Sequence, residues 1–272
     1  MEPRLESNLK NWNSRVEVHA KSRFYDVEGW LHNAPGPPPR EVEALGDLEG
    51  KTLVHLQCHF GMDTLSWARA GANVTGLDFS TAAIDEANSL AERAGLSEHA
   101  SFVCANVYDA SEALQRKRFD VVYVSLGSLC WLPDVAAWGE VVADLLAPGS
   151  RLYLHDVHPF SSCFDGDGER VVYSYYEDPD EPQIFDSTST YTDGEELSAI
   201  RTYEWNHSIG EMVAALLGHG LVLDSLTEHD WTLFHQFPWL EETESGLLVV
   251  PEGRPRIPLS FTILAHKPSS VL

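Results

Sequence analysis

The sequence predicts an α/β fold, a doubly wound, Rossmann-like and mostly parallel sheet that ends in an antiparallel hairpin and carries a small β-rich insertion. The main observation is that short apolar runs alternate with segments of helical periodicity through the middle of the chain. Strands are expected near residues 52–56, 73–77, 101–105, 119–124 and 151–155. Helices are expected between them, near residues 63–70, 80–94, 110–116 and 134–146. Because helices separate the strands, the sheet should be parallel and covered on both faces.

The segment before the first strand, residues 1–40, is predicted to be an arm that folds over the core as part of a lid. Residues 1–33 have an amphipathic helical pattern and are rich in Trp, His and Tyr. Residues 34–40, with the sequence APGPPPR, indicate a stiff linker that cannot be helical, because proline lacks the amide hydrogen that a helix uses.

The core, residues 41–160, is followed by a segment of different composition. Residues 161–206 mix aromatic, β-branched and hydroxyl side chains between turn signals, which is typical of an inserted antiparallel meander or lid. Residues 207–272 are expected to complete the core sheet.

This C-terminal part begins with a helix signal. Ser208 and Glu211 have the spacing of a capping box. Strands near residues 221–228 and 258–266 then close the chain, separated by a long loop at residues 236–257.

Composition argues against several partners. The chain has 272 residues and a net charge of −24, from 18 basic and 42 acidic side chains. A field of that sign repels phosphate backbones and anionic membrane surfaces, so neither nucleic acid nor a membrane is an expected partner. No apolar run is long enough to span a bilayer, and the N-terminus lacks a secretory signal pattern. The four cysteines are scattered without a CxxC pair, which is typical of buried reduced thiols in a cytoplasmic protein.

Residues 53–87 contain the most informative local pattern, a strand, a sharp corner, a helix and a second strand. The corner ends at Gly61, and Asp63 or Thr64 is expected to cap the helix that follows. Asp78 stands at the end of the second strand. Such a βαβ unit binds nucleotides across the carboxyl ends of its strands. The spacing therefore predicts a backbone cradle at the corner and a carboxylate for a ribose diol.

These motifs resemble those of the class I S-adenosylmethionine (SAM) dependent methyltransferases, most strongly over residues 45–160. LQCHFGMDTLSWAR looks like the first motif of a subgroup of small bacterial members, in which Gln57, His59 and Gly61 stand where the superfamily has GxGxG. LLAPGSRLYLHDVHP is similar to the helix, turn and fifth strand of that fold, and the helix and strands after residue 208 to its terminal hairpin.

This resemblance implies SAM as the cofactor and a small molecule as the methyl acceptor. Asp78 matches the ribose-binding acidic residue, and Asn106 with Val107 matches the pair that contacts adenine. Main-chain amides of residues 58–61 would bind the methionine carboxylate near a helix N-terminus. The expected cofactor-binding residues are Tyr25, Gln57, Cys58, His59, Gly61, Asp78, Phe79, Asn106, Val107 and Ser125.

Several of these residues also have an ordinary structural explanation. Asp78 could cap the next helix, Asn106 could form a turn, and Tyr25 could pack in the core. His59 is interpreted as a residue that shapes the loop beside the cofactor, and His55 as a hydrogen-bonded interior histidine.

Three histidines near the expected methyl group are candidates for the general base that an oxygen or a protonated nitrogen acceptor requires. His155 and His158 lie at the end of the fifth strand, and His207 lies just before the capped helix. Oxygen is the preferred acceptor atom and nitrogen the second, because histidine suits proton removal. No metal is expected, since strand alternation would point His155 and His158 to opposite faces. The expected aromatic lining comprises Tyr25, Trp131, Tyr173, Tyr176 and Trp205.

Two other functions remain open at this point. A nicotinamide-dependent Rossmann oxidoreductase is disfavoured by the missing GxGxxG pattern and by the terminal hairpin. A non-catalytic SAM-binding protein is the other alternative, because the first motif has lost two glycines.

Overall fold

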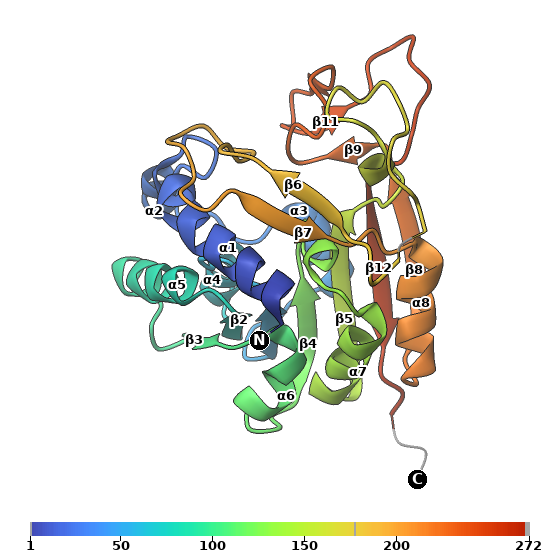
Figure 1. The fold of residues 1–272 in the computed structure, drawn as a ribbon. Helices are drawn as coiled ribbons and strands as arrows, with labels where there is room; N and C mark the ends of the chain where they lie inside the picture. The colour runs from blue at the N-terminus through green and yellow to red at the C-terminus, as the bar shows by residue number, and fades with distance from the viewer. Residues whose placement is uncertain (1, 177, 270–272) are drawn as a thin grey trace.

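The computed structural model describes residues 2–176 and 178–269 and confirms the predicted fold class (Figure 1). Its central sheet has seven strands in the order β3-β2-β1-β4-β5-β12-β8. They are β1 (Thr52–Leu56), β2 (Asn73–Asp78), β3 (Ala100–Cys104), β4 (Phe119–Val124), β5 (Leu146–Val157), β8 (Val222–His229) and β12 (Ser260–His266). Strands β1 to β5 run parallel, whereas β12 lies antiparallel between β5 and β8. The predicted terminal hairpin is therefore present, and the predictions for residues 1, 177 and 270–272 fall outside the described residues.

Alternate residues of the parallel strands face two separate helical layers. Val54 and Leu154 are fully buried toward the layer of α6 (Ala110–Ala113), α7 (Val135–Leu145) and α8 (Ile209–Gly218). Leu53 and Tyr153 are buried toward α3 (Pro39–Leu45) and α4 (Met62–Arg69), beside which lies α5 (Thr81–Arg93). Because both faces are covered, the strands read as nearly continuous apolar runs in the sequence.

Side-chain caps mark the start of several helices, and α5 and α8 are examples. Ala83 N donates to Ser80 Oγ (3.1 Å) at the start of α5. At α8 the predicted capping box is present: Glu211 N donates to Ser208 Oγ (3.2 Å), and Ser208 N donates to Glu211 Oε2 (2.7 Å). These bonds satisfy amide groups that a helix start leaves unpaired.

Three expectations about element boundaries are wrong. Helix α3 begins at Pro39, inside the segment predicted to be non-helical, because proline at the first helical position needs no amide hydrogen. Helix α4 is preceded by Gly61 as its cap residue, and neither Asp63 nor Thr64 caps it. The predicted loop at 236–257 also contains two strands, β10 (Glu241–Glu242) and β11 (Leu248–Val249), which form a small antiparallel sheet with β9 (Trp231–Thr232).

The arm and the insertion come together above the carboxyl ends of the sheet strands (Figure 1). The arm consists of α1 (Pro3–Lys21) and α2 (Val27–Asn33), and the insertion contributes the hairpin of β6 (Gln183–Asp186) and β7 (Arg201–Glu204). Buried Asn8 donates through Nδ2 to the carbonyl of Tyr203 (2.7 Å) and accepts from its amide through Oδ1 (2.8 Å). Asn11 Nδ2 donates to the carbonyl of Ala199 (2.6 Å). The polar side of α1 thus binds the backbone of the insertion.

Two surface properties complete the description. Among the described residues, none of the helices combines the length and the apolarity that crossing a lipid bilayer requires. Cys58 and Cys163 are buried and unpaired, but Cys104 is exposed, so the expectation of buried thiols does not hold for every cysteine.

A glycine pair tests how closely α7 and α8 pack. A Cβ at Gly139 would lie 2.9 Å from the backbone of Ala215, whereas a Cβ at Gly218 would meet nothing within 4 Å. Replacing glycine by alanine in a helix ordinarily stabilises it by about 1 kcal/mol. We expect Gly139→Ala instead to lower the free energy of unfolding by about 1–3 kcal/mol through overpacking, while Gly218→Ala leaves it unchanged or slightly raised. Urea unfolding of both variants measures this, and equal effects would contradict the close packing.

Candidate active site

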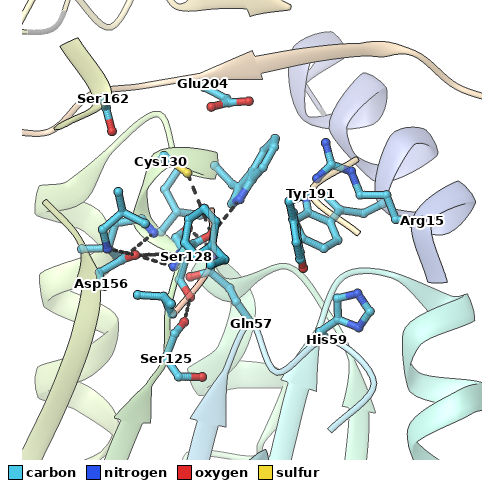
Figure 2. A pocket seen from close by; sticks show the side chains of 18 of the residues that line it. Arg15, Gln57, His59, Ser125, Ser128, Cys130, Asp156, Ser162, Tyr191 and Glu204 are labelled. Carbon is cyan, nitrogen blue, oxygen red and sulfur yellow. Dashed lines mark hydrogen bonds between the residues drawn. The ribbon is translucent and has the colours of Figure 1, made fainter. Parts of the chain in front are cut away.

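A cavity of about 740 Å³ lies over the carboxyl ends of β1, β2 and β4, a volume typical of small-molecule sites (Figure 2). Every residue predicted to bind a cofactor lines it: Tyr25, Gln57, Cys58, His59, Gly61, Asp78, Phe79, Asn106, Val107 and Ser125. These residues come from the arm and from the segments that follow four different strands. The parallel sheet brings the strand ends to one edge, and the cavity lies at that edge.

The corner after β1 keeps a left-handed backbone although it has only one glycine. The φ angles of Gln57, His59 and Gly61 are 57°, 51° and 79°, a region that costs a non-glycine residue about 1–2 kcal/mol. A Cβ at Gly61 would lie 2.6 Å from the ring of Phe102, so this position admits glycine alone. Gln57 is held by a bond from Nε2 to the carbonyl of Ser128 (2.7 Å). The corner therefore has the shape that glycines would give it.

All four amides of this corner already have partners within the protein. Cys58 N donates to the carbonyl of Leu77 (3.0 Å), and His59 N donates to Asp78 Oδ2 (2.9 Å). Phe60 N donates to His59 Nδ1 (2.7 Å), and Gly61 N donates to the carbonyl of Cys58 (3.0 Å). The expectation that the amides of residues 58–61 bind a carboxylate is therefore wrong, because their hydrogens stabilise the corner itself.

Asp78 is placed where the sequence predicts it, at the end of β2 and in the cavity wall. Its Oδ1 accepts from Ser80 N (2.9 Å) and its Oδ2 from His59 N, and the backbone of Phe79 is a third partner of the carboxylate. A carboxylate has about four lone-pair sites, so these partners do not fill it. Burial raises the pKa of Asp78 to about 6, against the opposing effect of these bonds. Ser80, and not Asp78, caps α5.

Asn106 combines the two roles that the sequence left open. Its Oδ1 accepts from Tyr108 N (3.1 Å), which is the turn-forming role. The residue also lines the cavity, so its amide nitrogen is the group it can offer to a ligand.

The segment Ser125–Trp131 forms the cavity floor beyond β4, and Asp156 holds it in place. The buried Asp156 carboxylate accepts from the amides of Gly127, Ser128 and Leu129, the last at 2.9 Å. Burial raises the pKa of Asp156, and the surrounding amides oppose that shift. Because its oxygens are occupied by backbone donors, Asp156 positions this segment and is not available as a base.

Ser125 links the floor to Asp63, a residue that the sequence identified only as a possible cap. Ser125 Oγ donates to Asp63 Oδ2 (3.2 Å) and lies 3.1 Å from His55 Nε2. Asp63 lines the cavity and carries a negative charge in the first turn of α4. His55 also lines the cavity and is hydrogen-bonded on both ring nitrogens, the second to Thr64.

A pair of histidines joins the arm to the corner. Because Phe60 N donates to His59 Nδ1, the neutral ring carries its proton on Nε2, which donates to His19 Nδ1 (2.9 Å). His19 Nε2 then donates to Thr190 Oγ1 in the insertion (2.9 Å). Burial lowers the pKa of His19 to about 3 and that of His59 well below its usual value, so both rings are neutral near pH 7. This chain of bonds closes the arm over the corner.

The three predicted catalytic histidines are separated by the structure. His207 lines the cavity and lies 2.6 Å from the carbonyl of Leu132, to which its Nε2 donates. His155 and His158 do not line the cavity. The prediction that these two histidines lie beside a reacting group is therefore wrong. The course of β5 explains why.

Strand β5 continues through Val157, so alternation points His155 to the α3 face of the sheet. There its ring packs against Trp231 at 5.3 Å, and burial lowers its pKa to about 3. His158 Nε2 bonds to Glu228 Oε1 (2.8 Å) on β8, away from the cavity.

Aromatic side chains form much of the remaining wall. Tyr25, Trp131, Tyr173 and Trp205 line the cavity as predicted, whereas Tyr176 is 75% exposed and does not. Sequence reasoning missed further lining residues, namely Trp12, Arg15, Tyr191, Glu204 and Phe234. A signal for the arm was present, because Asn8, Asn11, Arg15 and His19 recur at helical spacing and all are buried.

Comparison with known proteins gives one family match. Residues 54–152 match the model of a methyltransferase domain. The ubiquinone biosynthesis O-methyltransferase of Ralstonia nicotianae is 32% identical over 117 residues, which cover 43% of this chain and 48% of that protein. The probable chloroplastic tocopherol O-methyltransferase of Oryza sativa subsp. japonica is 27% identical, over 93% of this chain and 68% of that protein. In three curated relatives, including the Ralstonia protein, the match covers between 32% and 48% of their length.

The fold itself is shared with solved structures. The SAM-dependent methyltransferase of Mesorhizobium loti has a TM-score of 0.54 at 18% identity, over 84% of this chain and 96% of that one. At this identity the similarity shows the fold alone.

The role of Asp156 can be tested by removing its carboxylate. Asp156→Ala leaves at least three buried amides without an acceptor, and we expect it to lower the free energy of unfolding by about 3 kcal/mol. Asp156→Asn keeps one acceptor oxygen and should cost less. Urea unfolding gives the stabilities, and amide hydrogen exchange should accelerate at residues 127–129 in the alanine variant. Unchanged exchange there would show that another group holds the segment.

Proposed function

We propose that this chain is a class I SAM-dependent methyltransferase that transfers a methyl group to an oxygen, or secondly a nitrogen, of a small-molecule acceptor. The observation that carries the proposal is the convergence of all ten predicted cofactor contacts on one cavity at the carboxyl edge of the sheet. SAM supplies an electrophilic methyl group, and the protein supplies placement and exclusion of water.

We assign the adenosine end of the cofactor to the residues around β2 and β3. Asp78 would accept from the ribose diol through the lone pairs that its backbone donors leave. The amide nitrogen of Asn106 would donate to the adenine edge, with Phe79 and Val107 beside the ring. These polar groups and apolar side chains fit an adenosine.

The amino-acid end of the cofactor fits the groups between β1 and β4. Gln57 Oε1 is buried and has no hydrogen-bond partner among the described residues. Such an acceptor suits the α-ammonium group, and the Asp63 carboxylate in the same wall adds a negative charge. We assign the α-ammonium group to this pair.

For an oxygen acceptor a base must remove the hydroxyl proton, and we propose His207 for this role. It is the one of the three candidate histidines that lines the cavity. Its Nε2 lies 2.6 Å from the Leu132 carbonyl, a contact that fixes the ring in the cavity wall.

The names of two similar proteins support oxygen as the acceptor atom. The Ralstonia and rice proteins are both named O-methyltransferases. A glycopeptide N-methyltransferase shares the fold at a TM-score of 0.54, which keeps nitrogen as the second choice.

Isothermal titration with S-adenosylhomocysteine (SAH) tests the cofactor assignment directly. We expect a single site with sub-millimolar or tighter affinity, and no comparable binding of NADH. Absence of SAH binding would reject the proposal. Incubation with SAM and fractionated metabolites, followed by a search for products heavier by one methylene, then identifies the acceptor.

The pKa of Asp78 predicts a pH dependence of cofactor binding. Because burial raises that pKa to about 6, the carboxylate is ionised above this pH and protonates below it, where it loses acceptor strength. We expect SAH affinity to be constant above about pH 7 and to fall as the pH drops through about 6. His59 and His55 do not titrate in this range, since burial lowers the pKa of the first well below its usual value and that of the second to about 3.

Two variants isolate this effect. Asp78→Asn should bind SAH more weakly by about 1–3 kcal/mol and lose the pH dependence. Asp120→Asn, which changes a carboxylate bonded to Thr52 at the opposite end of β4, should behave like the wild type. A folded Asp78→Asn variant with wild-type affinity would refute the ribose assignment.

A further inference from the structure

Arg15 is the one lysine or arginine among the described residues that line the cavity. It lies on α1, is 9% exposed, and donates from Nε to Asn11 Oδ1 (2.6 Å). Its guanidinium lies 4.8 Å from the ring of Trp12 and 5.3 Å from that of Trp131. Figure 2 shows Arg15 reaching from α1 into the cavity beside Tyr191.

The terminal nitrogens of Arg15 have no hydrogen bond or ion pair with any residue that the structure describes. Glu204, the acidic side chain of β7 in the same wall, attracts this charge but forms no ion pair with it. A buried cation without an ion-pair partner is costly, so a site that retains one is suited to a ligand anion.

The corner of β1 lacks the groups that would otherwise bind an anion. The amides of residues 58–61 are all occupied within the protein. The first turn of α4 carries Asp63, whose charge opposes an anion at that helix end. Arg15 lies close to this corner, because its guanidinium is 4.8 Å from the Trp12 ring and the centroid of that ring is 5.3 Å from that of His59.

We propose that Arg15 binds a carboxylate in the closed cavity, and that this carboxylate is the one at the amino-acid end of the cofactor. The assignment rests on the proposed function. The two terminal nitrogens of an arginine match a planar carboxylate in bidentate geometry. A monoanion suits the site better than a phosphate, because Asp63, Asp78 and Glu204 line the same cavity.

The arrangement makes cofactor binding depend on the arm. The hydrogen bonds of Asn8 and Asn11 to the insertion, and of His19 to His59, hold α1 where Arg15 faces the corner. The arm therefore contributes a cationic group that the corner after β1 does not supply.

The test compares two thioethers of adenosine that differ in the amino-acid end, which carries the carboxylate. SAH carries the amino-acid end, whereas 5′-methylthioadenosine lacks it. Isothermal titration of both compounds is done with the wild type, Arg15→Met, Arg15→Lys and Lys10→Met. Lys10 is an exposed residue of the same helix, paired with Glu6, so Lys10→Met removes an equal charge outside the cavity.

We expect Arg15→Met to weaken SAH binding at least tenfold and to leave methylthioadenosine binding unchanged. Arg15→Lys should recover part of the loss, and Lys10→Met should match the wild type. Equal weakening of both thioethers in Arg15→Met and Arg15→Lys would overturn the proposal, because it would indicate a general loss of lid closure. Thermal unfolding of each variant shows whether the arm change has affected folding.

A second experiment tests whether Arg15 instead binds a carboxylate on the acceptor. In SAH-saturated protein, saturation-transfer NMR compares 4-hydroxybenzoate with 4-hydroxybenzamide. A wild-type preference for the acid that Arg15→Met abolishes, with SAH affinity unchanged, would assign the same carboxylate chemistry to the acceptor. If Arg15→Met changed neither SAH binding nor the preference for the acid, carboxylate binding by Arg15 would be overturned. Failure of the wild type to bind SAH at all would instead reject the proposed function.

Discussion

The hydrogen bond from the backbone amide of His59 to the Asp78 carboxylate is the interaction on which the cavity depends. It joins the corner after β1 to the end of β2, and it stabilises a left-handed residue that is not glycine. The bond between Gln57 and the Ser128 carbonyl joins the same corner to the segment after β4. Two unfavourable backbone conformations thus persist because contacts with neighbouring strand ends determine them.

Compared with a glycine-rich loop, this corner gains side-chain hydrogen-bonding groups and loses free backbone amides. Side chains at positions 57 and 59 give the corner hydrogen-bonding groups that glycines lack, and His59 uses them to bind the arm. The same construction occupies the corner amides, which are then no longer free for a ligand. Among the described residues that line the cavity, the one lysine or arginine is Arg15, which lies on the arm.

The cavity floor and its roof have different origins in the sequence. Ser125, Asp78 and Gln57 lie where their strands end; periodicity predicted those strand ends, and the resemblance to the methyltransferase superfamily implied that Ser125 and Gln57 belong to the site. The roof is made by residues that are far from them in the chain, such as Arg15 and Glu204. The buried polar stripe of α1 was visible as a helical spacing, but its partner, the backbone of β7, was not.

The sequence by itself determined the alternation of strands and helices, the parallel sheet with its terminal hairpin, and the edge at which the candidate binding residues meet. The alternation and the shared edge follow from local periodicity and from the rule that parallel strands end on one side, whereas the resemblance to the methyltransferase superfamily implied the terminal hairpin. Only the tertiary structure decided that the corner amides are occupied, that His155 and His158 face away from the cavity, and that Arg15 points into it. The reason is that hydrogen-bond partners and side-chain directions depend on packing between distant segments, which no local pattern encodes.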